Sequence, residues 1–232
     1  RSEANGIPEN IHRPGAVYYR FFNPSATLQI RVQPLEPRIF VTQQTDCYFG
    51  EDEIKVTAQL NYDIQRAGIF SFQLKVPEDL EIDSVNVSGL KEYNFDKESR
   101  LLTVSLQQKF QGKLKLQVRA HRDLAQDDLS GTVDIPILEA TDVERETGQI
   151  ALYAPESMEL IISNPDVVGA QPANSPQQRQ SGRLALASVW EYNRRPVVIP
   201  VEIQIKPTRL VADVATSINV KEQIAEVTSR IN

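Results

Sequence analysis

The sequence predicts an all-β protein made of antiparallel β-sandwich modules in tandem, with no long helix. Three observations support this fold class. Val, Ile, Leu, Phe and Tyr dominate the apolar residues while Met and Trp occur once each, a composition that favours pleated packing. Apolar and polar residues alternate with period two along most of the chain. Residues 187–232 also match residues 16–61 without a gap, at a constant offset of 171 (residue 16 aligns with residue 187).

The internal match predicts a repeated structural unit, because a fixed period is the signature of repeat architectures. The apolar pattern stays in phase throughout: Ile30 aligns with Val201, and Val56 with Val227. Each of these two pairs is therefore expected to share one backbone conformation. The chain begins without Met and stops at Asn232, so we expect a segment of a longer array that holds roughly one and a third modules of about 171 residues.

The strands follow from the alternation, taken in chain order. Residues 54–64 alternate clearly, Gln65 to Gly68 form a turn signal, and residues 69–76 alternate again, so 54–76 is expected to be a β-hairpin. Residues 220–231 have apolar positions at helical spacing, but their alignment with residues 49–60 favours a strand. Further strands are expected at 28–32, 80–87, 91–95, 101–107, 112–120, 132–138, 148–154, 158–163, 183–192, 197–205 and 209–214.

These strands suggest four parts of the chain. Residues 1–15 are expected to be a flexible leader, 16–125 a first β-sandwich sub-domain, 126–208 a second β-rich sub-domain, and 209–232 the start of the next repeat. Pattern alone leaves open whether each period is one large sandwich or two small ones joined near 123–131. We favour two sub-domains, with a long polar loop over residues 163–182.

Composition excludes several classes of function. The net charge is −6 and the basic residues are scattered, so a nucleic-acid partner is not expected. No apolar run approaches the length of about eighteen residues that a membrane span needs, and this fragment is not expected to span a membrane. Nucleophile-elbow, zinc-protease, Walker and dinucleotide motifs are missing from the sequence, so no enzyme is expected.

Cys47 is the only cysteine, so it has no partner for an internal disulfide. Its aligned residue in the second copy is Ile218, which favours a small buried hydrophobe over a reactive thiol. The chain has two histidines, His12 and His121, and no motif around either of them indicates a catalytic base.

Acidic residues supply one candidate metal site. Asp46, Glu51, Asp52 and Glu53 surround Gly50, and oxygen-rich turns of this kind bind Ca²⁺. Only Glu51 has an identical counterpart in the second copy, so solvated acidity is the alternative, and no other cofactor is expected. The densest acidic cluster, Glu139, Asp142, Glu144 and Glu146, lacks the turn-shaping Gly or Asn of a calcium loop.

Aromatic residues supply one candidate ligand platform. Trp190, Tyr192 and Tyr153 have apolar ring faces with polar tips, which suit the stacking of sugar rings. Trp190 and Tyr192 align with Tyr19 and Phe21, so the alternative is that the aromatic pair packs within or between modules.

Together these observations predict a non-catalytic structural or interaction module, for scaffolding or adhesion, in a larger repetitive extracytoplasmic protein. In pattern only, the organisation resembles the repeats of large bacterial surface or secreted proteins. The expected partners are neighbouring modules of the same chain or other proteins, and possible glycans. The alternative is a carbohydrate-binding accessory module of a secreted hydrolase.

Overall fold

The computed structural model describes residues 19, 22–23, 25, 27–125, 128, 131–173, 184–206, 214–222 and 224–231. The chain divides into two units, Arg1–Leu35 and Glu36–Asn232. The second unit holds all the strands of the described residues, and a short 3-10 turn spans Asn164–Asp166. The strands are β1 (Arg38–Phe49), β2 (Glu53–Lys75), β3 (Glu81–Val87), β4 (Leu90–Asp96), β5 (Leu101–Asp123), β6 (Thr132–Asp134), β7 (Glu139–Ala140), β8 (Arg145–Ala154), β9 (Met158–Ile161), β10 (Ala170–Pro172), β11 (Ala185–Tyr192), β12 (Pro200–Ile205), β13 (Val214–Lys221) and β14 (Ile224–Ile231).

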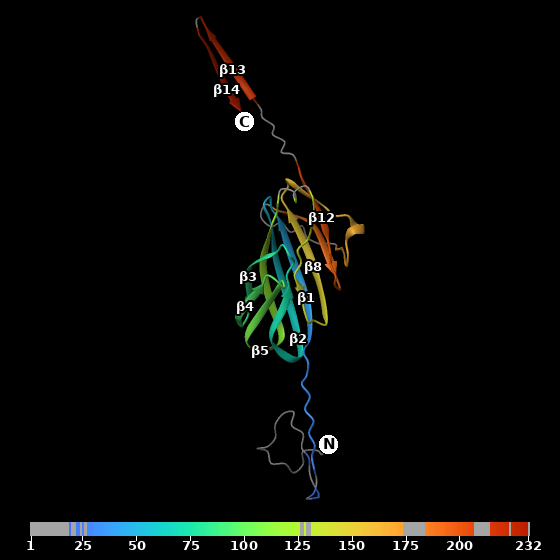
Figure 1. Ribbon diagram of the computed structural model, residues 1–232. Helices are drawn as coiled ribbons and strands as arrows, with labels where there is room; N and C mark the ends of the chain where they lie inside the picture. Colours follow the sequence, from blue (N-terminus) through green and yellow to red (C-terminus); the bar gives the residue numbers. More distant parts are fainter. Residues whose placement is uncertain are drawn as a thin grey trace. The chain divides into compact units, whose positions relative to one another are not determined.

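A nine-stranded sheet forms the main part of the domain (Figure 1). Its strands follow the order β10-β11-β8-β1-β2-β5-β3, while β4 pairs with β5 and β7 pairs with β2. A three-stranded antiparallel sheet, β6-β12-β9, contributes Val133, Val201 and Ile203 to the same buried core. The prediction of a mostly β protein without long helices is confirmed for the described residues.

The large sheet is mixed, because β1 pairs antiparallel with β2 but parallel with β8. Period-two alternation is the same in both kinds of pairing, so the sequence pattern could not distinguish them. The parallel pair joins Phe40–Tyr48 to Arg145–Tyr153. Strands from both expected sub-domains, 16–125 and 126–208, therefore belong to one sheet, although β6, β9 and β12 form a separate one.

The predicted hairpin over residues 54–76 is wrong. Residues 53–75 form one long strand, β2, which pairs along most of its length with the equally long β5. The segment read as a turn is an irregularity in this pair, with a register shift between Ile64 and Ile69. A Cβ atom on Gly68 would lie 2.7 Å from the Phe110 carbonyl oxygen, so glycine there permits close approach of β5.

The core is formed by the inward positions of the alternating strands, chiefly those of the large sheet. In β1 and β2 these include Cys47, Phe49, Ile54, Val56 and Leu60, each at most 1% exposed. Cys47 is thus the buried hydrophobe that its sequence context predicts, and burial raises the pKa of its thiol, with a smaller contribution from Asp46.

The C-terminal hairpin β13–β14 has the same strand register as β1–β2, shifted by the offset of the sequence match. Thr45 lies opposite Ala58 in the first hairpin and Thr216 opposite Ser229 in the second. Val56 and Val227 both lie in antiparallel strands, opposite Cys47 and Ile218 respectively. Residues 220–221 and 224–231 therefore lie in strands, as the alignment favoured, and not in a helix.

The earlier part of the match differs in structure. Val201 is buried in β12 between β6 and β9, whereas Ile30 lies outside any strand and is 75% exposed. A strand forms only where a neighbour satisfies its backbone groups, and residues 27–35 have no paired strand within the described residues. The expectation of one conformation holds for Val56 and Val227 and is wrong for Ile30 and Val201. Among the described residues, no helix is long and apolar enough to cross a membrane.

Candidate functional site

The predicted aromatic platform lies inside the domain. Trp190, Tyr192 and Tyr153 are at most 4% exposed. The Trp190 indole Nε1 donates a hydrogen bond to the Ser188 hydroxyl at 3.1 Å, and the Tyr153 ring stacks on Tyr48 with centroids 4.9 Å apart. These ring faces therefore pack against protein and do not form an exposed stacking surface.

The predicted calcium site does not gather its carboxylates around one point. Asp46 lies within β1, Glu51 and Asp52 are exposed in the turn after it, and Glu53 begins β2 with an ion pair to Lys55 at 2.7 Å. Among the described residues, no three His, Cys, Asp or Glu side chains are placed to hold a metal ion.

The acidic cluster before β8 separates into exposed and buried carboxylates. Glu144 is exposed and makes a bidentate ion pair with Arg38. This hydrogen-bonded pairing lowers the pKa of Glu144. Glu146, two residues later, points into the core and is 5% exposed. Glu144 lies before β8, which begins at Arg145, whereas Glu146 occupies an inward position of β8, so one carboxylate is in solvent and the other is in the core.

Glu146 lies at the centre of a buried polar cluster. Its carboxylate accepts hydrogen bonds from the Tyr192 hydroxyl at 2.7 Å, from the Arg195 guanidinium and from the Ala140 backbone N–H at 3.0 Å. In the amide orientation that satisfies its neighbours, Gln43 donates to the same carboxylate at 3.0 Å. Burial, with a contribution from Glu146, raises the pKa of Tyr192. The carboxylate is fully engaged, as a structural ion pair requires.

Gly148 makes room for this cluster. A Cβ atom at Gly148 would lie 2.7 Å from the Tyr192 hydroxyl oxygen and 2.6 Å from the Gln43 backbone carbonyl oxygen. A larger residue would therefore displace the tyrosine whose hydroxyl binds Glu146. The sequence left Tyr192 with two possible roles, in a ligand platform or in packing, and the structure places its ring in packing.

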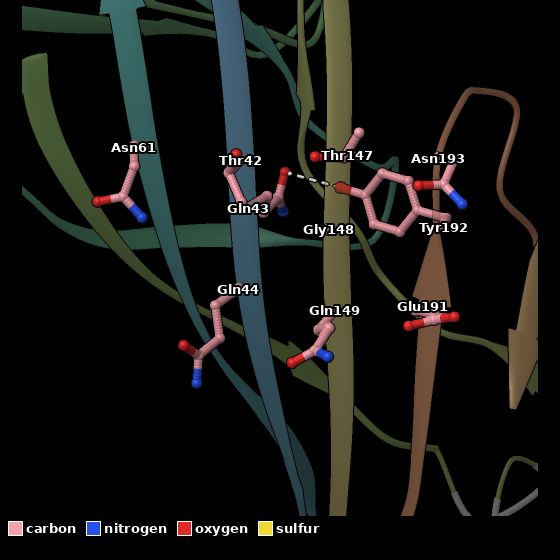
Figure 2. Close-up of a pocket in the computed structure, with 10 residues that line it drawn as sticks. All are labelled: Thr42, Gln43, Gln44, Asn61, Thr147, Gly148, Gln149, Glu191, Tyr192 and Asn193. Atoms are coloured by element: carbon pink, nitrogen blue, oxygen red, sulfur yellow. Dashed lines mark hydrogen bonds between the residues drawn. The ribbon is translucent and has the colours of Figure 1, made fainter. Parts of the chain in front are cut away.

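The outer face of the sheet holds a polar hollow that sequence reasoning missed (Figure 2). Its volume is about 310 Å³. It crosses β2, β1, β8 and β11, and Gln44, Gln149 and Glu191 lie side by side on three of these strands. The side chains that line it are chiefly amides, hydroxyls and one carboxylate, and they include Thr42, Gln44, Asn61, Thr147, Gln149 and Glu191.

The amides continue across the sheet as a row. Gln44 lies opposite Gln149 on β8 and opposite Gln59 on β2, and Gln59 lies opposite Gln117 on β5. We call these four residues the amide row. Alternation alone marks each of them as an outward position, but only the register of strands far apart in the sequence brings them together.

His121 lies on the same face, at the end of β5. Its Nδ1 is 2.6 Å from an Asp83 carboxylate oxygen, and this hydrogen bond raises the pKa of His121. The sequence gave this histidine no context of a catalytic base, and it directly follows the strand expected at residues 112–120. The structure adds its carboxylate partner from β3.

The His121–Asp83 pair predicts a small pH dependence of stability. Because the pKa is raised in the folded state, the stabilisation is complete below the ordinary pKa of about 6.5 and is lost as the pH rises through the folded value. Both side chains are partly exposed, so the effect is below about 1 kcal/mol. Thermal unfolding of His121→Gln should show a larger deficit at about pH 5.5 than at about pH 8. An equal deficit at both values would contradict the pairing, and Asp83→Asn should reproduce the pH-dependent part.

Comparison with known proteins gives fold-level matches only. No protein-family model matches the chain, and no curated protein matches it. An M1 zinc metallopeptidase from Deinococcus radiodurans has a TM-score of 0.42 and 10% identity, over 84% of this chain and 47% of that chain. A two-domain M1 zinc metallopeptidase variant bound to L-tryptophan has a TM-score of 0.45 and 11% identity, over 84% and 48%. This chain spans about half the length of those proteins, and similarity at this level carries no argument about function.

Proposed function

We propose that this chain is a non-catalytic structural or interaction module of a larger repetitive protein, in which modules like residues 36–206 follow one another. One observation carries the proposal: the hairpin β13–β14 repeats the register of β1–β2 at the offset of the sequence match. Under this proposal, residues 214–231 are the first hairpin of the next module.

The exposed apolar side chains of the hairpin support this interpretation. Ile218, Val220 and Val227 are 63%, 74% and 59% exposed. They align with Cys47, Phe49 and Val56, which are at most 1% exposed because the rest of the domain covers them. An apolar sheet face of this kind is stable when another layer packs on it. The covering layer would come from residues equivalent to 62–206.

The carboxylates considered for chemistry support a structural role as well. Glu144 is paired with Arg38, Glu53 with Lys55, and Glu146 is enclosed in the buried cluster. Each of these groups has a partner that holds it in one place. An extracytoplasmic location is part of the proposal, and it rests on the resemblance in pattern to repeats of bacterial surface and secreted proteins.

The sequence that follows Asn232 in the natural protein tests the repeat. It should align with residues 62–206, with its apolar positions in phase. A stop or an unrelated continuation would reject the array and leave only a local similarity between two hairpins.

Val227→Asp tests whether the hairpin belongs to a further module. In the present chain we expect the thermal midpoint to change little, because Val227 is exposed. In a chain extended through the following repeat, the substitution places a carboxylate in a core and should remove one unfolding transition. Thr228→Asp, at the neighbouring outward position, is the matched control and should leave every transition in place. Equal behaviour of the two variants in the extended chain would contradict the proposal.

A further inference from the structure

We infer that the outer face of the large sheet binds a neutral glycan chain along the amide row and the adjoining hollow. This inference goes beyond the proposed function and does not depend on it, because it concerns only the domain formed by residues 36–206. The amide row is Gln149, Gln44, Gln59 and Gln117, on β8, β1, β2 and β5.

The four amides have unused hydrogen-bonding capacity. Within the described part of the chain, none of them makes a side-chain hydrogen bond, and each is partly or fully exposed. Several other glutamines of this domain are engaged: Gln73 donates to the Thr103 hydroxyl at 3.0 Å, and Gln171 to the Glu191 carboxylate at 2.7 Å. A free carboxamide offers two N–H donors and an acceptor oxygen. The row therefore presents unpaired donors and acceptors on the outer face of the sheet.

The charge of the hollow selects against anionic ligands. Among the described residues, no Lys, Arg or His side chain lines it, and its single carboxylate, Glu191, already accepts a hydrogen bond from Gln171. Phosphates, nucleic acids and acidic peptides need cationic partners. A neutral ligand rich in hydroxyl groups matches amide and threonine side chains, because a hydroxyl both donates and accepts.

The shape of the site favours a chain of sugars over a peptide. Neighbouring strands lie about 4.8 Å apart, so the row extends for roughly 14 Å across the sheet, which is longer than a single sugar ring. An extended peptide commonly binds by pairing with a free strand edge and placing side chains in pockets. Here the polar groups are on the face of the sheet, where the backbone of all four strands is already paired.

A titration followed by ¹H–¹⁵N correlation spectra tests the inference, with cellohexaose, maltohexaose and mannohexaose used in turn. We expect at least one of these oligosaccharides to shift the backbone signals of β8, β1 and β2 and the side-chain amide signals of the row. The double variant Gln44→Ala/Gln59→Ala should bind about tenfold more weakly, the effect of losing two ordinary hydrogen bonds.

The matched control is Gln204→Ala, which removes an exposed glutamine from β12 in the other sheet and should bind like the unmodified protein. Absence of shifts with all three oligosaccharides would overturn the inference. Shifts that the double variant leaves unchanged would also overturn it, by placing the site elsewhere. A neutral peptide of alanine and serine that shifts the same signals more strongly would replace the glycan with a peptide partner. The proposed function is tested separately, by the sequence that follows Asn232, so a failure of the glycan inference leaves it unaffected.

Discussion

Leu60→Asp is expected to abolish the cooperative unfolding transition of the domain. Leu60 is 0% exposed in β2, between Gln43 on β1 and Leu116 on β5. The substitution removes a buried leucine side chain, which costs about 2–5 kcal/mol, and adds the cost of several kcal/mol for burying a carboxylate. The sum is comparable to the whole stability of a typical domain, about 5–15 kcal/mol. Circular dichroism during heating measures the loss.

Asn61→Asp is the matched control, because it introduces the same carboxylate at the next residue of the same strand. Asn61 is exposed, so the free energy of unfolding should change by no more than about 0.5 kcal/mol. Leu60→Ala should fall between the two, with a lowered midpoint and an intact transition. A preserved midpoint in Leu60→Asp would contradict the register of β2, since a shift by one residue exchanges the two faces.

The alternation around Leu60 shows what the sequence can predict. Residues 54–64 alternate so regularly that their inward and outward positions follow from local pattern alone, and burial in the structure agrees. The same pattern carries no information on strand partners. The turn signal at Gln65–Gly68 arises because Gly68 permits the close approach of Phe110 in β5, a contact between segments about forty residues apart. Local reasoning cannot distinguish that use of glycine from a hairpin turn.

The candidate sites illustrate the same limit. Gln44 and Gln149 are ordinary polar residues until the parallel pairing of β1 with β8 places them side by side. Glu146 looks like part of a solvated acidic cluster, yet β8 directs it inward, where Arg195 neutralises it. The match between residues 16–61 and 187–232 is different in kind, because it compares the chain with itself and needs no knowledge of strand partners. It favoured a strand for the segment that ends in β14, and β13–β14 pairs in the register of β1–β2 shifted by the offset of the match.

Arg195→Met is expected to destabilise the domain by about 3–5 kcal/mol, because it leaves a charged group buried without its partner. Glu146 is 5% exposed, and Arg195 supplies it with an ion pair and donates a second hydrogen bond to the Leu138 carbonyl oxygen. The guanidinium also lies 5.0 Å from the centre of the Tyr192 ring. Methionine keeps much of the apolar stem that packs there, so the loss measured by chemical denaturation reports chiefly on the charge.

The double variant Arg195→Met/Glu146→Gln separates the ion pair from the packing. With both charges removed, the new carboxamide oxygen would still accept a hydrogen bond from Tyr192, so we expect the double variant to be more stable than Arg195→Met alone. This non-additivity is the mark of two groups in direct contact. The comparison also needs the single variant Glu146→Gln. If the losses of stability in Arg195→Met and Glu146→Gln simply added in the double variant, Glu146 would draw no stabilisation from Arg195. The cluster would then be held by Tyr192, Gln43 and the Ala140 N–H. If the double variant recovers stability relative to Arg195→Met, the net contribution of the buried ion pair to stability is small. The role of the pair is then to fix the arrangement of β8, β11 and the loop before β12.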